Sequence, residues 1–129
     1  MNTEYEIWSL MNLGLIGNAM YMVAMVLLTW LGFRFAAAIA ADPSTPMMGK
    51  ITATVFYLIV GFMFYNTAQV GGMIIASSAE NFALLPEMSS RAADLIVRVE
   101  SGFIPGGVMT TALNIVIVFF QLAMTWIKR

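Results

Sequence analysis

Cysteine and histidine are both absent from this sequence of 129 residues, and charged residues are scarce. Without these two residue types the chain has no disulfide, no axial histidine for haem, no cysteine ligand for an iron–sulfur cluster and no ordinary zinc site. Catalytic triads built on a Ser–His or Cys–His pair are excluded for the same reason. We therefore expect a protein that is not an enzyme and that carries no metal or redox cofactor of its own.

The low charge also limits the partners. Lys and Arg total 6 against 7 Asp and Glu, which gives a net charge of −1. Proteins that bind nucleic acid, or anionic lipid through a polybasic segment, need several clustered basic residues. We therefore expect no nucleic-acid partner, and the sequence gives no reason to infer a soluble substrate.

Hydrophobic residues make up 60% of the chain and charged residues 10%. Soluble globular domains have about 45–50% and roughly 25%, respectively. Three uncharged runs account for the difference, at residues 7–33, 51–79 and 102–127. Each run exceeds the roughly 20 residues that a spanning helix needs, and none alternates as a transmembrane strand does. The sequence therefore predicts an all-α integral membrane protein, a single domain over residues 1–129 with three transmembrane helices.

Aromatic and basic side chains mark the ends of these spans. Trp8 and Trp30 lie roughly 33 Å apart at the rise of an α-helix, which matches a hydrocarbon core. Trp126 closes the third run, and Arg34 follows the first run at a position suited to an interfacial, snorkelling side chain. The first helix is expected to continue past Arg34 until the prolines in residues 42–46 end it.

The basic residues predict the orientation, because cytoplasmic loops carry more Lys and Arg than loops on the other side. With the N-terminus outside, the inner set outnumbers the outer set: Arg34, Lys50, Lys128 and Arg129 against Arg91 and Arg98. We therefore predict an N-out, C-in bundle. We place it in the bacterial cytoplasmic membrane or an equivalent energy-transducing membrane.

The segment between the second and third runs is the only sizeable extramembrane loop. Glu87, Arg91, Asp94 and Arg98 recur there at helical spacing with alternating sign. Apolar residues fall on another face, so the pattern predicts a short amphipathic helix over about residues 87–100, lying at the outer membrane surface. Two interpretations stay open for the charged face: a solvated connector, or a docking surface for a partner's extracytoplasmic domain.

One asparagine lies near the midpoint of each run, and an up-down-up bundle would hold the three amides at similar depth. Small and polar residues accompany them at helical spacing. Small residues let helix backbones approach, and amides hydrogen-bond across helices. The candidates for helix–helix or partner contacts are Gly14, Asn18, Gly61, Tyr65, Asn66, Gln69, Gly72, Gly107, Thr111, Asn114 and Gln121.

These features favour a non-catalytic accessory or structural subunit of a larger integral membrane complex. Such a chain would pack against the catalytic subunits of, for example, a membrane oxidoreductase such as a respiratory complex or a metal-dependent monooxygenase. The expected partners are larger membrane subunits and lipid, and structural lipids are the only bound molecules we expect.

Two alternatives remain. The first is a homo-oligomeric channel or small-solute pore lined by the mid-span Asn, Thr and Gln side chains, since polar uncharged groups suit a pore lining. The second is a copper-handling protein that uses its 12 methionines, among them Met20, Met22 and Met25. The thioether is a soft ligand for Cu(I), but methionine is also a flexible filler of irregular interfaces.

Overall fold

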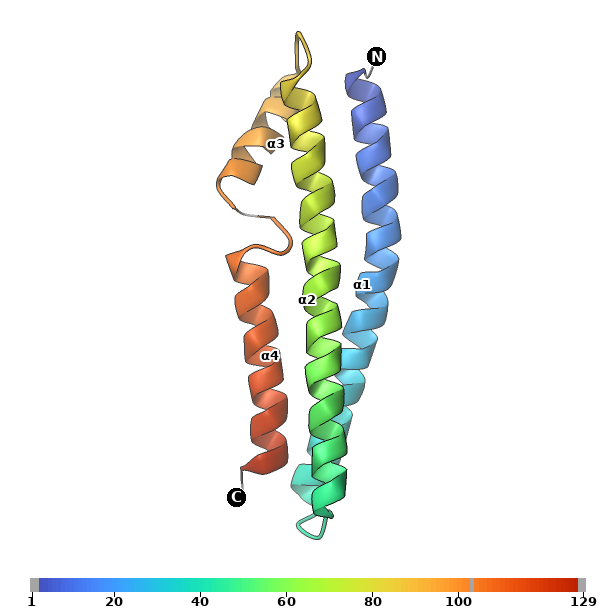
Figure 1. Cartoon of the computed structure of the whole chain (residues 1–129), viewed down its shortest axis with the longest axis vertical. Coiled ribbons are helices and arrows are strands. Elements are labelled where there is room, and N and C mark those ends of the chain that lie inside the picture. The colour runs from blue at the N-terminus through green and yellow to red at the C-terminus, as the bar shows by residue number, and fades with distance from the viewer. Residues whose placement is uncertain (1–2, 103, 128–129) are drawn as a thin grey trace.

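The computed structural model describes residues 3–102 and 104–127, and its regular secondary structure there is entirely helical. The helices are α1 (Glu4–Ala41), α2 (Met47–Ala83), α3 (Ser90–Glu100) and α4 (Val108–Trp126). α1 and α2 run antiparallel, while α3 and α4 follow one another along the length of α2 (Figure 1). α1, α2 and α4 are each long and apolar enough to cross a membrane, which confirms the predicted membrane helices.

The ends of α1 follow from local capping. Thr3 and Glu6 form a capping box, in which the Glu6 amide donates to Thr3 Oγ1 and the Thr3 amide donates to Glu6 Oε2, both at 3.2 Å. The helix continues to Ala41, as the prolines after it predicted, because Asp42 takes an extended backbone before Pro43. The chain then turns tightly into α2.

The three spanning helices differ in length. α1 and α2 have 38 and 37 residues, whereas α4 has 19. At the α-helical rise, α1 and α2 are each about 55 Å long and α4 about 28 Å, so α4 alone matches the hydrocarbon core. α1 and α2 continue well past the start of α4, and α3 lies beside this extension (Figure 1). Between α3 and α4 the backbone leaves the helical conformation at Gly102 and Gly106, whose φ angles are 78° and 83°.

Each end of the bundle has a buried cluster that packs its helices together. The first joins α1, α2 and α3 through Ile7, Phe82 and Ala92. The second joins α1 and α2 near their connecting turn through Ala36, Ala53 and Tyr57, with side chains of α4 packed against it. Outside these clusters most large apolar side chains of the spans are exposed, as expected for helices surrounded by lipid.

α3 begins at Ser90, three residues later than the sequence predicted, because the Ser89 hydroxyl accepts a hydrogen bond from the Ala92 amide at 3.3 Å and caps the helix there. Its apolar face packs on protein: Ala92 is fully buried against Ile7 and Phe82. The amphipathic pattern is therefore used to attach α3 to the ends of α1 and α2. A location of α3 at the membrane surface stays a prediction.

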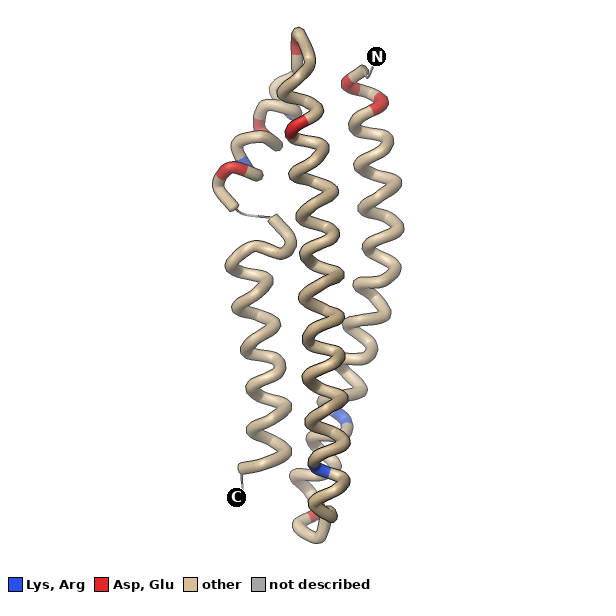
Figure 2. The backbone as a smooth tube through the Cα atoms, viewed as in Figure 1, with Lys and Arg blue, Asp and Glu red and all other residues tan. Residues whose placement is uncertain are grey.

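Charged residues gather at the two ends of the bundle and leave its middle uncharged (Figure 2). Arg34 and Lys50 lie at the end that carries the α1–α2 turn, and the charges of α3 lie at the other end. Lys128 and Arg129, which contribute to the predicted orientation, lie outside the described residues. The N-out, C-in orientation therefore stays a prediction.

Candidate functional site

The contact between α4 and α2 is made by an amide and a glycine. Asn114 Nδ2 donates to the backbone carbonyl of Gly61 at 3.0 Å. A Cβ on Gly61 would lie 2.7 Å from Val118 Cγ2, so only glycine lets the two helices approach this closely. The carbonyl of Gly61 uses a second lone pair for this bond, which leaves the α2 backbone ladder intact.

A second amide ties α4 to α1. Gln121 is buried, and its Nε2 donates to the carbonyl of Thr29 at 3.1 Å. Gly32 makes room for this side chain, because a Cβ there would lie 2.6 Å from Gln121 Nε2. α4 is thus hydrogen-bonded to both of its neighbours through side chains that donate to helix carbonyls.

Near the α1–α2 turn a buried hydroxyl pair adds a contact that the sequence did not indicate. Tyr57 Oη lies 2.8 Å from Thr125 Oγ1. Thr125 donates its single hydroxyl hydrogen to the carbonyl of Gln121 at 2.9 Å, so Tyr57 is the donor in the pair. The available signal was a general one, namely that a buried tyrosine finds a partner for its hydroxyl. Nothing local to the sequence singles out Tyr57.

The segment that links α3 to α4 crosses α2 at Gly72, one of the contact residues expected from the sequence. Gln69 Nε2 donates to the carbonyl of Gly106 at 2.7 Å. A Cβ on Gly72 would lie 2.1 Å from the carbonyl oxygen of Pro105. A Cβ on Gly107 would meet the same segment, at 2.5 Å from the Gly102 carbonyl oxygen. This crossing requires glycine because the neighbour is backbone and cannot move aside.

The three mid-span asparagines do not share one depth, so that expectation is wrong. Asn18 lies against Gly71, and Asn114 lies against Gly61. Ten residues of α2 separate these two levels, which corresponds to roughly 15 Å. This difference in depth arises because the first residues of the third run form the irregular segment before α4. The middle of the run is therefore not the middle of the helix.

Asn66 is separate from the other candidates, because its side chain is exposed on the face of α2 opposite the buried one. Tyr65, beside it, is 37% exposed and lines a groove between α2 and α4. Gly14 and Thr111 are half-buried: Gly14 lies against Ile74, and Thr111 is in the first turn of α4.

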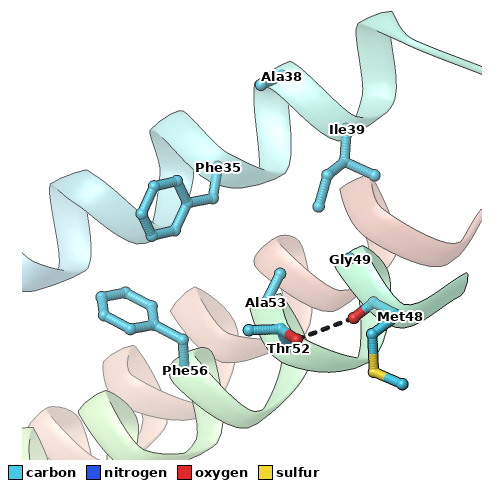
Figure 3. A pocket seen from close by; sticks show the side chains of 8 residues that line it. All are labelled: Phe35, Ala38, Ile39, Met48, Gly49, Thr52, Ala53 and Phe56. Carbon is cyan, nitrogen blue, oxygen red and sulfur yellow. Dashed lines mark hydrogen bonds between the residues drawn. The ribbon is translucent and has the colours of Figure 1, made fainter. Parts of the chain in front are cut away.

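Apolar grooves open on the outside of the bundle. The larger, of about 490 Å³, lies between α1 and α2 close to their turn (Figure 3). The rings of Phe35 and Phe56 meet edge to face across it, with their centroids 5.3 Å apart. The Thr52 hydroxyl donates a hydrogen bond to the Met48 carbonyl at 2.9 Å. The groove between α2 and α4, of about 430 Å³, includes Asn114. Such open apolar grooves suit a lipid chain or a partner's side chains.

The interfacial anchors pair with basic groups. The Arg34 guanidinium lies 5.5 Å from the Trp30 ring, and Lys50 Nζ lies 5.8 Å from the Trp126 ring. Both distances are within the range of a cation–π contact. These pairs lie at the same end of the bundle, where a headgroup region would accommodate the charges.

At the opposite end, Glu4 and Trp8 join α1 to α3. The Ser89 amide donates to Glu4 Oε2 at 3.2 Å, the Ser89 hydroxyl also contacts this carboxylate, and Trp8 Nε1 donates to Glu4 Oε1 at 3.3 Å. Arg91 stacks over Trp8 at 5.2 Å. Of the predicted docking charges, Arg91 therefore supports the local packing. The others, Glu87, Asp94 and Arg98, are exposed.

Metal ligands do not converge in the described part of the chain. Residues 3–102 and 104–127 contain no group of three His, Cys, Asp or Glu residues that could hold a metal ion. Among the methionines considered for copper, Met20 is exposed and Met25 is buried, so they point to different sides of α1.

No protein family matches this chain, and no curated protein or solved structure is significantly similar to it. The class follows from the fold: the part of the chain that the structure describes is all-helical and contains three helices of membrane-spanning length. The features of the molecule that bear on its role are the contacts between the helices and the surfaces that they leave exposed.

Proposed function

We propose that this chain is a non-catalytic accessory subunit of a larger integral membrane complex. The observation that carries the proposal is that Asn114 and Gln121 donate to the backbone carbonyls of Gly61 and Thr29. Side chains that could line a pore or meet a polar ligand are used to hold the bundle together. The chain therefore serves as a scaffold, which favours the accessory role over the channel.

The exterior of the bundle supports the same role. Large apolar side chains cover the outer faces of α1, α2 and α4, and the grooves between the helices are open and apolar. Such surfaces pack against lipid chains or against the helices of other membrane proteins. Larger membrane subunits, for example those of a respiratory complex or a metal-dependent monooxygenase, are the partners we propose.

The head formed by α3 and the protruding ends of α1 and α2 gives this subunit a second surface. Asp94 and Arg98 are exposed there on a helix whose apolar face is already covered. We propose that the head is extracytoplasmic, in the N-out orientation, and that these charges dock on a partner's extracytoplasmic domain. The membrane we propose is an energy-transducing one.

The test is the composition of the native particle. Membranes are extracted with a mild detergent, and the protein is resolved on a native gel. Every chain in its band is then identified by mass spectrometry. The expected result is a band of several hundred kilodaltons that contains larger, unrelated membrane subunits. A band that contains this chain alone, with solute flux in liposomes, would overturn the proposal and favour the channel.

The docking charges are tested in the same assay. Asp94→Asn combined with Arg98→Gln should reduce the yield of the larger subunits while leaving the helical content unchanged. Glu80→Gln, an exposed charge at the same end but on α2, is the matched control and should leave the yield unchanged. Equal yields from all three proteins would remove α3 from the docking surface.

A further inference from the structure

We propose that two copies of this chain pair side by side in the membrane through the outer face of α2, with the two Asn66 amides hydrogen-bonded to each other. The proposal concerns a surface that the internal contacts leave exposed. It holds independently of the accessory role, because a dimer can form with or without larger subunits.

Asn66 differs from the packed amides of the spans in where it points, and from the exposed Asn12 in lying near the middle of an uncharged run rather than near its end. Gln69, Asn114 and Gln121 each donate to a backbone carbonyl of another segment of the chain. Asn18 is half-buried against Gly71. Asn66 instead is exposed near the middle of the uncharged run 51–79, where a single chain would direct it into lipid. A polar amide in hydrocarbon is costly until it finds a hydrogen-bond partner.

The face around Asn66 has the geometry of a helix-packing surface. Its neighbours recur at intervals of three and four residues and are all exposed: Ile59, Phe62, Val70 and Met73. This spacing is that of the a and d positions of helices packed by knobs into holes, with the asparagine at a central position. Together the five side chains form an apolar ridge with a single amide at its centre.

The depth of Asn66 favours a second copy as the occupant. Copies that insert in the same orientation can be related by a two-fold axis normal to the membrane. Such an axis places each residue at the same depth as the equivalent residue of the other copy. An asparagine amide carries both a donor and an acceptor, so two of them satisfy each other. A different membrane protein would need its own polar side chain at this depth.

Cysteine cross-linking tests the arrangement directly, because the native chain has no cysteine. In native membranes under mild oxidation, Phe62→Cys and Val70→Cys, which flank Asn66 on the ridge and leave its amide in place, should each give a disulfide-linked dimer in high yield. Leu27→Cys on α1 and Leu113→Cys on α4 are the matched controls, since both positions are as exposed as the α2 ridge. They should remain monomeric. Equal cross-linking at all four positions, or none at positions 62 and 70, would overturn the proposal.

The role of the amide is tested separately. In lipid vesicles with fluorescently labelled protein, Asn66→Leu should weaken dimerisation roughly tenfold, the effect of losing two membrane hydrogen bonds of average strength. Asn66→Gln, which retains an amide, should keep most of the affinity. The Phe62→Cys cross-link should also decline when Asn66→Leu is added. A leucine variant that dimerises as tightly as the native chain would overturn the pairing of the amides.

The native-gel experiment keeps the two proposals distinguishable. A particle with larger subunits but no cross-link at positions 62 and 70 would leave the accessory role standing and rule out the dimer. A cross-linked dimer without larger subunits would do the reverse.

Discussion

Gln121 on α4 reaches across the bundle to the carbonyl of Thr29 on α1, at 3.1 Å, through space that exists only because residue 32 is glycine. The contact joins residues that are far apart in the sequence and fixes α4 against the helix that it would otherwise touch only through apolar side chains. Because an interhelical amide bond in a membrane protein contributes about 0.6 kcal/mol on average, such contacts matter more for register than for total stability.

Gly32→Ala should therefore displace Gln121 from Thr29 and destabilise the bundle. The added Cβ lies 2.6 Å from Gln121 Nε2. We expect a loss of about 0.6 kcal/mol and at most roughly 2, the range for one interhelical hydrogen bond in a membrane, because the displaced amide ends a flexible side chain. Unfolding in mixed micelles, followed by circular dichroism, measures it. Gly17→Ala on the same helix is the matched control, because a Cβ there meets nothing within 4 Å. It should be neutral or slightly stabilising. Equal losses from both variants would contradict the steric explanation.

Tyr57→Phe isolates the buried hydroxyl pair. Tyr57 donates to Thr125, whose own hydrogen is used on the Gln121 carbonyl, so Thr125 keeps one bond after the change. We expect a loss of about 0.6 kcal/mol and at most roughly 2, measured by the same unfolding assay. Tyr21→Phe is the control, since Tyr21 is 69% exposed on α1. A larger loss from the exposed position would show that the buried pair is not the stabilising contact.

Much of the fold could be predicted from the sequence, because long uncharged runs have few alternatives to spanning a membrane. The end of α1 before Pro43 could be predicted for an equally local reason. Asn114 and Gln121 could be named as contact residues, since amides in a span seek a carbonyl. The partner carbonyls could not, because they depend on the stagger of three helices of unequal length.

The side of α2 on which Asn66 lies could not be predicted from the sequence, for a different physical reason. α2 is apolar on all sides, so its periodicity does not separate the side that packs on α1 and α4 from the side that meets lipid. The prediction that Asn18 and Asn114 lie at the same depth was wrong, because glycines at positions 102 and 106 make the start of the third run non-helical. An uncharged run fixes the length of a hydrophobic segment, but it does not fix where a helix begins within it.

Gly72→Ala should be more damaging than Gly32→Ala, because the atom that the new Cβ meets is backbone. Its distance to the Pro105 carbonyl oxygen would be 2.1 Å, and that oxygen belongs to the segment that carries the chain into α4. We expect α4 to separate from α2 at this end. Limited proteolysis between α3 and α4 should become faster than in Gly17→Ala. Unchanged proteolysis would mean that the segment can shift without loss of packing.

The turn between α1 and α2 makes a prediction about pH. The Asp42 carboxylate accepts hydrogen bonds from the Ser44 hydroxyl at 2.6 Å and the Ser44 amide at 2.9 Å, and these bonds hold the pKa of Asp42 below its ordinary value. A lowered pKa in the folded state means that the carboxylate stabilises the turn above the unfolded pKa, and that this contribution is lost as the pH falls through the folded value.

Nuclear magnetic resonance of the labelled carboxyl carbon in micelles measures the titration. Ser44→Ala removes the side-chain donor and should move the midpoint upward toward that of an ordinary aspartate. A midpoint already ordinary in the native chain, or unchanged in Ser44→Ala, would show that the Ser44 hydroxyl does not stabilise the ionised form.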